Sequence, residues 1–598
     1  MQSRLCLLGL LVAVAAAPVS GTIIVPKLTA NQDSLVKHVI NILLKAFRDP
    51  FEATLIRQKA SSPDGGLLHA SIISKVVEQL RGLIVMQFTN PVDGTFRRPN
   101  NRIGFLVDSY EAYELLFREF TAQQNGASGK ILIVHSGRLN ESIARLIFDD
   151  LWRQHIINAV LLGNTELGVQ LWSYVPYVKG SCGLVNLIRL EASDPADTLY
   201  PDKTKSFHGF PFKVGSFETR PFTIMQFSEN GTREVSGFEG DLLDVLSKRL
   251  SFEVTIVEPG NGEQWGYALK ENSTGLMGMI QREEVDFGIS CLGISVARIK
   301  ILKAGIAHYT TALVLAVPKG RRYSSLEKLI LPFKKKVWYF LAIFVLGAIV
   351  VICLVEYKND DVRNFVYGRN IRSPYLNLLQ VLFGITIHLT PSRNFARTLL
   401  FLWMIHSMVL RTCYQGSMYR FLQRKSTLPP SQTLNEIDQT GALYYVVESG
   451  ERYYEAFPHR YQRVRHLPQE HNNIIRRLKW MMSHPRSPDV VQGALDHIAY
   501  HNRLYRKRGG FQLICPEFIS TFTVAIFYPK RSILMEQFDN KIQHIQASGL
   551  MSFWVTRYGD YDFRRPKKTP RPKRLNNRYL VFAYQMGAIL LIASGVVF

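Results

Sequence analysis

The chain has 598 residues, which at about 100–200 residues per domain predicts several domains. Apolar residues make up 47% and charged residues 20%, a composition that excludes an intrinsically disordered chain. Lys and Arg number 72 against 48 for Asp and Glu, and the resulting charge of +24 indicates either nucleic acid or an anionic membrane surface as a partner. The distribution of the apolar residues favours the membrane.

Residues 1–21 are predicted to form a secretory signal peptide. Arg4 supplies the charged start, Leu5–Ala17 the apolar stretch, and small residues follow. We expect cleavage near Gly21, because a cut after Ala17 would place Pro18 first. An uncleaved anchor is the alternative, although 13 apolar residues are short for a membrane span. A secreted N-terminus argues against a nuclear or cytosolic role in nucleic-acid binding.

Residues 22–205 are predicted to form an α/β domain. Short apolar runs typical of buried strands alternate there with helical patterns. The runs are Gly82–Phe88, Arg102–Val107 and Lys130–His135, and the helical patterns cover 35–48, 111–123 and 141–155. This alternation predicts a small doubly wound sheet with helices on both faces.

Two further α/β segments flank a central apolar region, one over 206–330 and one over 425–563. Neither segment contains enough strand and helix patterns for a complete sheet domain. We therefore predict one bilobed α/β domain of the periplasmic-binding-protein type, split in sequence by a membrane insert.

Two uncharged apolar stretches are predicted to span a membrane. Residues 337–355 form a run of 19, and residues 579–598 a run of 20 in which Gln585 is the only strongly polar side chain. At 1.5 Å per residue either helix crosses about 30 Å of hydrocarbon. Because the signal peptide places the N-terminus outside, the first span runs outward to inward.

Residues 374–392 and 398–422 lie between these spans and differ from them. The apolar part of the former, 376–389, has 14 residues, about 21 Å as a helix, and is bounded by prolines, which suits a re-entrant pore loop. The latter is long enough to span but carries Arg411 and Arg420, which predicts that it faces other helices or an aqueous cavity. Three spans and one half-span are the outline of a pore.

The basic linker 564–578 gives a conflicting topology. It contains eight Lys or Arg residues and no acid, so the positive-inside rule would place it in the cytoplasm. That placement would require 376–389 to cross completely and would move 425–563 inside. The short length of 376–389 favours the re-entrant alternative, with 425–563 outside.

The sequence shows no catalytic motif and no spaced set of metal ligands, so we predict neither an enzyme nor a cofactor. Six cysteines are too few for a disulfide scaffold, and Cys182, Cys291 and Cys515 leave an odd number in the soluble segments, so their pairing stays open. Three sequons precede the first predicted span and are candidate glycosylation sites, at Asn140, Asn230 and Asn272.

The order of these parts, and a series of short motifs at matching spacing, resembles the ionotropic glutamate receptors. In chain order the motifs are Phe217–Phe222 (FETRPF), Gly237–Leu250 (GFEGDLLDVLSKRL), Val285–Ser290 (VDFGIS), Leu292–Arg298 (LGISVAR), Cys413–Leu422 (CYQGSMYRFL), Glu448–Gly450 (ESG) and Phe522–Arg531 (FTVAIFYPKR). The segment Leu331–Phe333, followed by Trp338, resembles the collar that enters the membrane. The chain looks most similar to the divergent chemosensory ionotropic receptors of insects, over about 206–598.

The resemblance implies a ligand site around Arg298. A guanidinium holds a carboxylate with two parallel hydrogen bonds, and Ser295 is placed to cap the helix that contains the arginine. The matching positions imply further ligand contacts at Phe222, Glu451 and Arg452. The alternative is that Arg298 forms an ordinary surface ion pair.

The sequence departs from the family pattern at several ligand positions. Gly293 stands where the family has threonine, and Glu451-Arg452 where it has a Ser-Thr pair. No acid lies at 500–503, where the residue that binds the ligand amine is expected; Asp496 is nearby but does not align. We therefore expect an acidic ligand other than glutamate, with an uncharged ligand as the alternative.

The resemblance also implies pore and gate residues at His388, Arg411, Tyr414 and Phe421. Four copies of Arg411 in a homotetramer would repel one another and oppose cations. We therefore expect a heterotetramer with co-receptor subunits, unless Arg411 turns away from the pore axis.

Together these features predict a subunit of a ligand-gated, non-selective cation channel that serves as an olfactory or gustatory receptor. The chain would cross the plasma membrane several times, with its N-terminus and ligand-binding domain outside. Closure of the domain on a small molecule would open the pore. A membrane-anchored binding protein that conducts nothing is the alternative.

Overall fold

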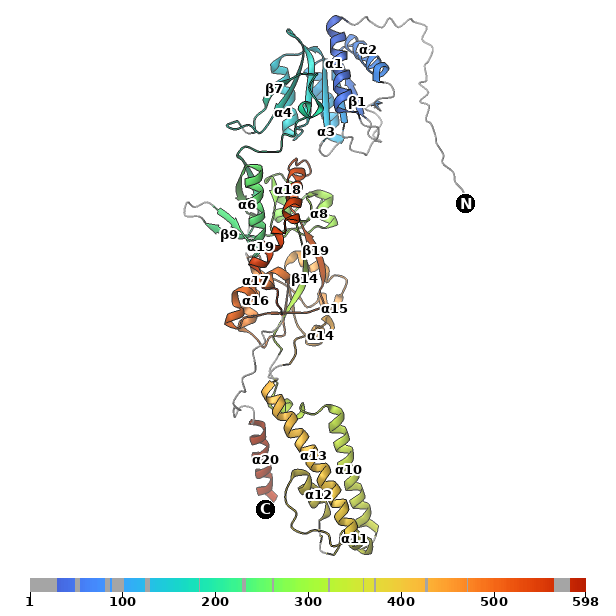
Figure 1. Ribbon diagram of the computed structural model, residues 1–598, viewed down its shortest axis with the longest axis vertical. Helices are drawn as coiled ribbons and strands as arrows, with labels where there is room; N and C mark the ends of the chain where they lie inside the picture. Colours follow the sequence, from blue (N-terminus) through green and yellow to red (C-terminus); the bar gives the residue numbers. More distant parts are fainter. Residues whose placement is uncertain are drawn as a thin grey trace, which may run out of the picture. The chain divides into compact units, whose positions relative to one another are not determined.

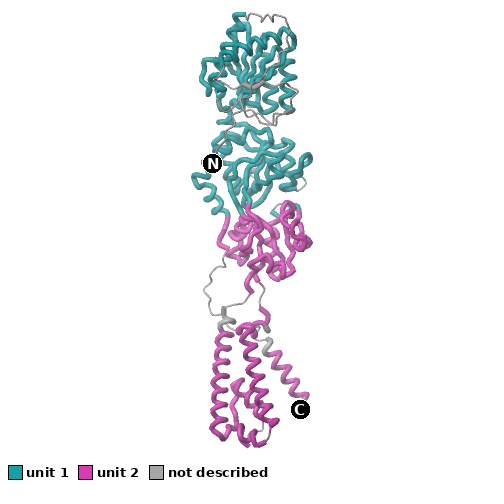
Figure 2. Tube along the Cα trace, turned by 90° about the vertical axis from the view of Figure 1, so that its right-hand side faces the viewer, with its two compact units in different colours: residues 1–311, 469–472, 522–558 teal, residues 312–468, 473–521, 559–598 magenta. Residues whose placement is uncertain are grey.

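The computed structural model describes residues 29–48, 54–80, 86–88, 102–123, 129–181, 183–227, 233–260, 263–320, 323–358, 360–369, 371, 373–424, 428–470, 472–563 and 581–597. The predicted signal peptide, Cys182, Asn230 and the basic linker lie outside these residues. The chain divides into two compact units, coloured separately in Figure 2. Unit 1 comprises Met1–Thr311, Gln469–Asn472 and Phe522–Tyr558, and unit 2 comprises Ala312–Pro468, Asn473–Thr521 and Gly559–Phe598.

The N-terminal part of unit 1 contains a seven-stranded sheet in the order β2-β1-β3-β4-β5-β6-β7. Its strands are β1 (Thr54–Lys59), β2 (Met86–Phe88), β3 (Arg102–Val107), β4 (Lys130–Arg138), β5 (Ala159–Thr165), β6 (Gly168–Val175) and β7 (Asn186–Leu190). Strands β1 to β5 are parallel, whereas β6 and β7 are antiparallel to their neighbours. The two-residue connection between β5 and β6 explains the change, because only an antiparallel pair can be joined so tightly.

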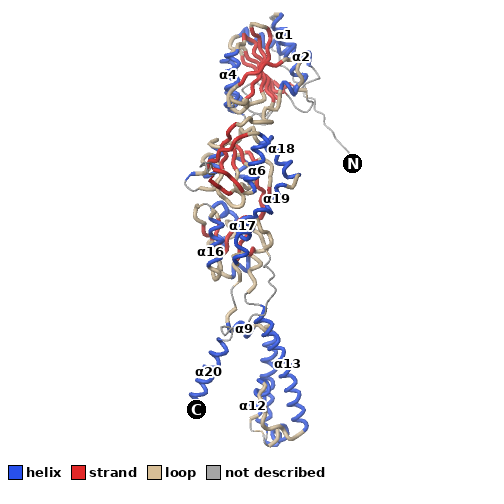
Figure 3. The backbone as a smooth tube through the Cα atoms, turned by 60° about the vertical axis from the view of Figure 1, so that its left-hand side comes forward, coloured by secondary structure: helices blue, strands red, loops and turns tan. Residues whose placement is uncertain are grey.

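Helices cover both faces of this sheet (Figure 3). Helices α1 (Ala30–Ala46) and α2 (Pro63–Leu80) pack on one face through residues such as Leu43 and Ile72. Helices α3 (Tyr110–Gln123) and α4 (Glu141–Arg153) pack on the other through Tyr113 and Phe148. The short helix α5 (Ala196–Leu199) follows β7.

The second sheet of unit 1 has the strand order β11-β8-β12-β20-β13. These strands are β8 (Phe210–Gly215), β11 (Phe252–Val257), β12 (Phe287–Gly288), β13 (Lys303–Ala304) and β20 (Phe527–Tyr528). Strand β20 comes from the predicted second segment, yet it pairs with β12 and β13 from the first. Around the sheet lie the hairpin β9 (Ile224–Phe227) and β10 (Arg233–Ser236), and the helices α6 (Phe238–Leu250), α7 (Gly275–Gln281), α8 (Val296–Ile301), α18 (Met535–Ala547) and α19 (Leu550–Tyr558).

The sheet of unit 2 shows the reciprocal exchange. Its order is β16-β15-β17-β14-β18, with β19 paired to β14. The strands are β14 (Tyr309–Val317), β15 (Tyr444–Val446), β16 (Val464–His466), β17 (Val490–Ala494), β18 (Leu513–Ile514) and β19 (Ser520–Val524), and the helices are α14 (Leu434–Gln439), η2 (Glu448–Tyr453), α15 (Pro458–Tyr461), α16 (Asn473–Ser483), α17 (Leu495–Tyr505) and η3 (Arg506–Arg508). Strand β14 precedes the apolar region in the chain, whereas its partners β17 and β18 follow it. Each segment therefore completes a sheet of the other.

The apolar region of unit 2 is helical (Figure 1). It contains α9 (Ser325–Ile330), α10 (Lys335–Lys358), α11 (Asp360–Val366), α12 (Pro374–Phe383), α13 (Asn394–Arg424) and, near the C-terminus, α20 (Val581–Val597). Within the described residues, α10 is the one helix that is long and apolar enough to cross a membrane by length and composition. Helix α13 is less apolar than α10 because it contains polar side chains such as His406 and Arg411, and α20 is shorter than α10. Spans at 398–422 and 579–598 therefore stay predictions.

Helix α12 covers only part of the predicted re-entrant segment. It has ten residues, about 15 Å of length. It ends at Gly384, whose φ of 82° belongs to the left-handed region that favours glycine. The chain is then non-helical up to Asn394, where α13 begins.

Candidate functional site

Arg298 lies in a short turn of helix whose start is set by a local cap. Ser295 accepts a hydrogen bond from the backbone N–H of Arg298 at 3.4 Å, as predicted for the N-cap of α8. The arginine side chain folds back, and its Nη1 donates to the Gly293 carbonyl at 2.8 Å. Arg298 is 7% exposed, so its guanidinium is held largely inside unit 1.

The structure explains why position 293 is glycine where the family pattern has threonine. It forms a β-bridge with Val524, and the Ile294 N–H donates to the Thr523 carbonyl at 2.8 Å. A Cβ atom at position 293 would approach the Phe522 ring to 2.9 Å, which is closer than real Cβ contacts allow. The loss of the hydroxyl therefore accompanies close packing of the returning strand against this loop.

The turn that leads into this loop is strained. Ser290 has a φ of 115° and Cys291 a φ of 54°, and neither is glycine. Such conformations cost on the order of 1–3 kcal/mol each and persist only where surrounding contacts enforce them. Here Glu239, in the first turn of α6, enforces them: its Oε2 accepts the N–H groups of Ser290 at 3.2 Å and of Cys291 at 2.8 Å.

His308 completes this buried cluster. Its Nε2 lies 3.0 Å from Oε1 of Glu239, and both side chains are buried. Because an ionised carboxylate only accepts hydrogen bonds, Nε2 carries the proton in this contact. Sequence analysis assigned no role to Glu239 or His308; the one available signal was an acidic residue within an otherwise apolar helix face.

The Ser290 side chain and carbonyl tie the turn to the neighbouring strands. Its hydroxyl lies 2.8 Å from Ser216 Oγ and 3.2 Å from Thr223 Oγ1, and it accepts from the Phe217 N–H at 3.1 Å. The Trp265 indole donates to the Ser290 carbonyl at 2.8 Å. This network fixes the backbone that carries Gly293 and Arg298.

Phe222, a predicted ligand contact, lies fully buried in unit 1, and its contact with a ligand stays a prediction. Its side chain has no exposed surface, because it packs against Phe238 with ring centroids 4.6 Å apart. Gly237, the residue before Phe238, has a φ of 96°. A Cβ atom at position 237 would lie 2.5 Å from the Phe222 carbonyl oxygen. The aromatic end of the FETRPF motif therefore serves the core of unit 1.

The other predicted ligand residues lie in unit 2, in η2. Glu451 accepts a hydrogen bond from His466 Nε2 at 3.0 Å, and the Arg452 guanidinium lies over the Tyr453 ring at 5.3 Å. Asp496 is buried in the first turn of α17 and accepts a hydrogen bond from the Tyr561 hydroxyl. The structure thus brings Arg298 and Ser295 together in one unit, and Glu451 and Arg452 in the other.

Gln492 is a residue of unit 2 that sequence analysis missed. It lies in β17 and is 1% exposed, and within the described part of the chain neither atom of its side-chain amide has a hydrogen-bond partner. A Cβ at Gly450 would meet its Oε1 at 2.5 Å, so the amide lies directly under the predicted ESG loop. Buried polar groups without partners are rare and call for an explanation such as an unseen ligand atom or water.

Tyr414, the predicted gate residue, contacts the predicted collar. Its hydroxyl donates to the Leu329 carbonyl in α9 at 3.0 Å, and its ring packs edge-on against Phe333 at 5.4 Å and Trp338 at 6.1 Å. The Trp338 indole in turn donates to the Ile330 carbonyl at 2.8 Å. The structure therefore joins α9, the start of α10 and α13 at one point.

The remaining predicted pore residues are less connected. The Arg411 guanidinium lies against Gly384, where any side chain would overlap it, so Arg411 contacts the end of α12. His388 is exposed in the non-helical stretch after α12, and Phe421 belongs to the last turns of α13. Of the sequons, Asn140 is exposed and caps α4 by accepting the Ile143 N–H at 2.8 Å, and Asn272 is exposed.

Two separate chain segments complete each other's sheets, and apolar helices lie between these segments in sequence. Two family models match the chain. The family described as "Putative ionotropic receptor, ligand binding domain" matches residues 26–204, and "Ligated ion channel L-glutamate- and glycine-binding site" matches residues 211–319. The first description attaches ligand binding to the N-terminal domain, and the second to the segment that contains Arg298.

The names of individual relatives agree with these two family descriptions. The chain is 22% identical to Ionotropic receptor 21a of Drosophila melanogaster over 406 residues, which cover 62% of this chain and 46% of the relative. It is 24% identical over 229 residues to Glutamate [NMDA] receptor subunit 1 of Drosophila persimilis, covering 34% and 22%, and 27% identical over 214 residues to Glutamate receptor U1 of Xenopus laevis, covering 34% and 44%. The chain spans about half or less of the length of the curated relatives it matches. These findings confirm the predicted relationship to the ionotropic receptors.

Proposed function

We infer that this chain is a subunit of a ligand-gated, non-selective cation channel that acts as a chemosensory receptor in the plasma membrane, with its N-terminus and binding domain outside the cell. The observation that carries the proposal is the exchange of strands between the two segments: β20 completes the sheet near Arg298, and β14 lies within the sheet of unit 2. The helices between these segments are therefore tied to the binding fold at both of their ends.

Ligand binding would open the pore because the ligand has different affinities for the closed and the open lobes of the binding domain. A ligand that binds the closed lobes more tightly than the open lobes shifts the population toward the closed state. Strand β14 is followed in the chain by α9, and the Leu329 carbonyl of α9 accepts the Tyr414 hydroxyl of α13. This contact supports a route by which movement of the binding fold reaches the helix proposed to line the pore.

The proposed ligand carries an acidic group that pairs with Arg298. Replacing Arg298 by Ala should weaken the agonist response by about 2–5 kcal/mol, roughly 30-fold to several-thousand-fold in half-maximal concentration. Arg298→Lys is the matched control, because it keeps the charge but loses the planar fork. Dose–response curves and surface labelling would be measured together; an unchanged curve with normal surface expression rejects this role and favours an uncharged ligand.

We propose that the subunit conducts only together with co-receptor subunits in a heterotetramer. Arg411 would add a positive charge per copy to a homomeric pore, and such rings oppose cations. Expression of this chain alone should give no ligand-evoked current, and co-expression with candidate co-receptors, tested against acids, amines, sugars and salts, should give one. Robust cation current from the chain alone would refute the proposal. In a conducting heteromer, unchanged conductance of an Arg411→Ser variant would mean that Arg411, which lies against Gly384, does not face the pore axis.

The second candidate is a membrane-anchored binding protein that conducts nothing. It draws support from the finding that a single helix of the described residues, α10, qualifies as a membrane span by length and composition. Ligand binding to the purified full chain, with no current in any subunit combination, would favour this candidate over the channel.

A further inference from the structure

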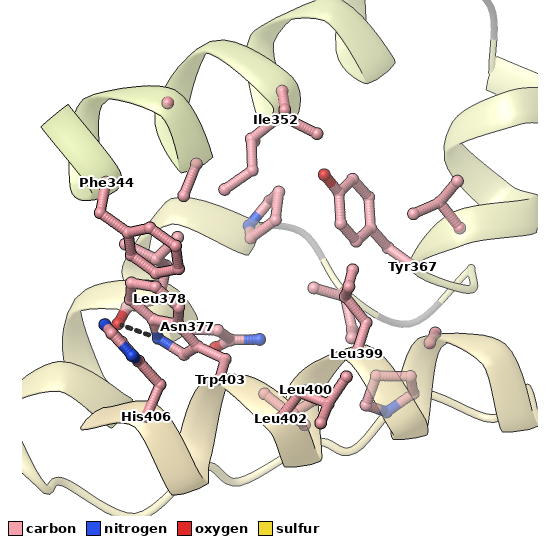
Figure 4. A pocket seen from close by; sticks show the side chains of 18 of the residues that line it. Phe344, Ile352, Tyr367, Asn377, Leu378, Leu399, Leu400, Leu402, Trp403 and His406 are labelled. Atoms are coloured by element: carbon pink, nitrogen blue, oxygen red, sulfur yellow. Dashed lines mark hydrogen bonds between the residues drawn. The ribbon is translucent and has the colours of Figure 1, made fainter. Parts of the chain in front are cut away.

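A cavity of about 640 Å³ lies among α10, α11, α12 and α13 of unit 2 (Figure 4). Its lining is apolar over most of its extent, and the described residues that line it include no Asp, Glu, Lys or Arg. Pockets that hold small organic molecules usually measure about 300–1,000 Å³, with mostly apolar walls and a few placed polar groups. The size and the lining of this cavity both fall within that description.

The cavity exists because small residues line part of it and because the Trp403 side chain is held in place on another side. Gly347 and Ala348 of α10 and Ala396 of α13 line the cavity without filling it. The Trp403 indole donates to the Leu378 carbonyl of α12 at 3.1 Å and stacks on Phe344 of α10 with ring centroids 5.6 Å apart. Because these contacts hold three helices together, the cavity is bounded by fixed side chains.

Besides the hydrogen-bonded Trp403 indole, three polar side chains line the cavity: those of Tyr367, Asn377 and His406. Figure 4 shows the hydroxyl of Tyr367, the residue after α11, pointing toward the space beside Ile352, and the Asn377 amide between Leu378 and Leu399. The His406 Nε2 is buried and has no hydrogen-bond partner among the described residues. Among the described residues, no hydrogen bond engages the Tyr367 hydroxyl or the Asn377 side-chain amide. An apolar ligand with one hydrogen-bonding group could therefore use either of them without displacing an internal partner.

We propose that this cavity is a binding site for a compact, uncharged, mainly hydrocarbon molecule that carries a single hydrogen-bonding group. An uncharged ligand fits best because the described lining holds no Asp, Glu, Lys or Arg, and burying an unpaired charge is strongly unfavourable. Helix α10 lines the site and is long and apolar enough to cross a membrane, so a membrane-spanning α10 would place the site at the depth of the lipid tails. The same chemistry belongs to a free alcohol-like molecule and to part of a bilayer lipid. The site is separate from Arg298, so it does not depend on the acidic ligand proposed above.

Photolabelling of the full chain in phosphatidylcholine nanodiscs tests the proposal. One arm uses a medium-chain alkanol that carries a diazirine, and the other uses phosphatidylcholine with a diazirine in its acyl chain. We expect label in peptides that contain Gly347, Asn377 or Leu399, and at least a tenfold loss of that label in Ala348→Trp, which fills the cavity. Label from the alkanol alone identifies a free molecule as the ligand, and label from the lipid alone identifies a lipid tail; either supports the site.

Leu346→Trp is the matched control, because Leu346 lies beside these residues on α10 but is 59% exposed and does not line the cavity. Its labelling should equal that of the unchanged chain. Asn377→Leu tests the polar group separately: it should keep label from a diazirine alkane and lose the preference for the alkanol. Absence of label in both arms, or equal label in Ala348→Trp and Leu346→Trp, would overturn the proposal, as would crosslinks showing that a helix of a second copy fills the space.

Discussion

Two buried polar residues, Glu239 of unit 1 and Gln492 of unit 2, differ in how their hydrogen bonds are completed. In unit 1, the Glu239 carboxylate contacts two backbone N–H groups and His308, and the Ser290 hydroxyl is engaged by several neighbours. In unit 2, the Gln492 amide is buried with no partner among the described residues. Leaving a buried polar group unpaired costs about 1–3 kcal/mol, so the second arrangement is unfavourable as it stands.

This difference suggests a division of labour between the units. The network around Glu239 holds the strained turn before Arg298 in one conformation, as a preorganised anion site requires. The Gln492 amide lies against Gly450, just before Glu451 and Arg452, which the family resemblance implies as ligand contacts. A bound molecule or a rearranged loop could supply the missing partner, and we propose on this ground that unit 2 is the half that responds to ligand.

The largest expected effect is at Glu239. Replacing it by Ala removes the hydrogen-bond acceptor of the Ser290 and Cys291 N–H groups and the partner of His308, and should destabilise unit 1 by about 1–3 kcal/mol for each buried group left unpaired. The thermal stability and surface expression of the full-length chain would show the loss. Glu239→Gln is the control: its carbonyl oxygen can still accept the Ser290 and Cys291 N–H groups, so it should recover much of the stability. If Glu239→Ala and Glu239→Gln lost the same stability, the hydrogen bonds accepted by the side-chain oxygen of residue 239 would not explain the loss.

A smaller, pH-dependent effect is expected at His501 in α17. Burial lowers the pKa of His501 to about 4, against an ordinary value of 6.5. Above pH 6.5 the residue is neutral in both the folded and unfolded states; as the pH falls from 6.5 to 4 the unfolded state takes up the proton first. The free energy of unfolding should therefore decrease over this window, by about 3 kcal/mol in total. Melting curves of wild type and His501→Phe between pH 7 and 4 would test this, and an unchanged pH dependence in the variant would exclude His501 as the cause.

The smallest expected effect, and the one that sharpens the comparison most, is at Gln492. Gln492→Met removes the unpaired amide at similar volume, so it should leave the melting temperature unchanged or raise it by the equivalent of about 1–3 kcal/mol. If the amide binds ligand, the same variant weakens the agonist response. Gln492→Ala, which leaves a cavity, should destabilise instead. A loss of stability in Gln492→Met as large as in Gln492→Ala would show that the amide is already paired.

Several features of the protein could be predicted from local sequence. The cap at Ser295 depends on a hydroxyl just before a helix, and the long apolar run predicts α10. One domain shared by two chain segments was predicted because neither segment alone contained enough strands for a sheet. The structure added that β20 and β14 are the strands that each segment contributes to the sheet of the other. These inferences needed only periodicity, capping residues and segment order, which the sequence contains directly.

Tertiary structure decided what the buried polar residues do. Glu239 is 51 and 52 residues from the two N–H groups that it binds and 69 from His308, so no local pattern could pair them. Phe222 fits a ligand motif by spacing but is enclosed by Phe238. The cavity beside Gly347 exists because four helices with small and large side chains meet there. Sequence determines where helices and strands begin and which faces are apolar, whereas the partners of a buried side chain depend on the packing of distant segments.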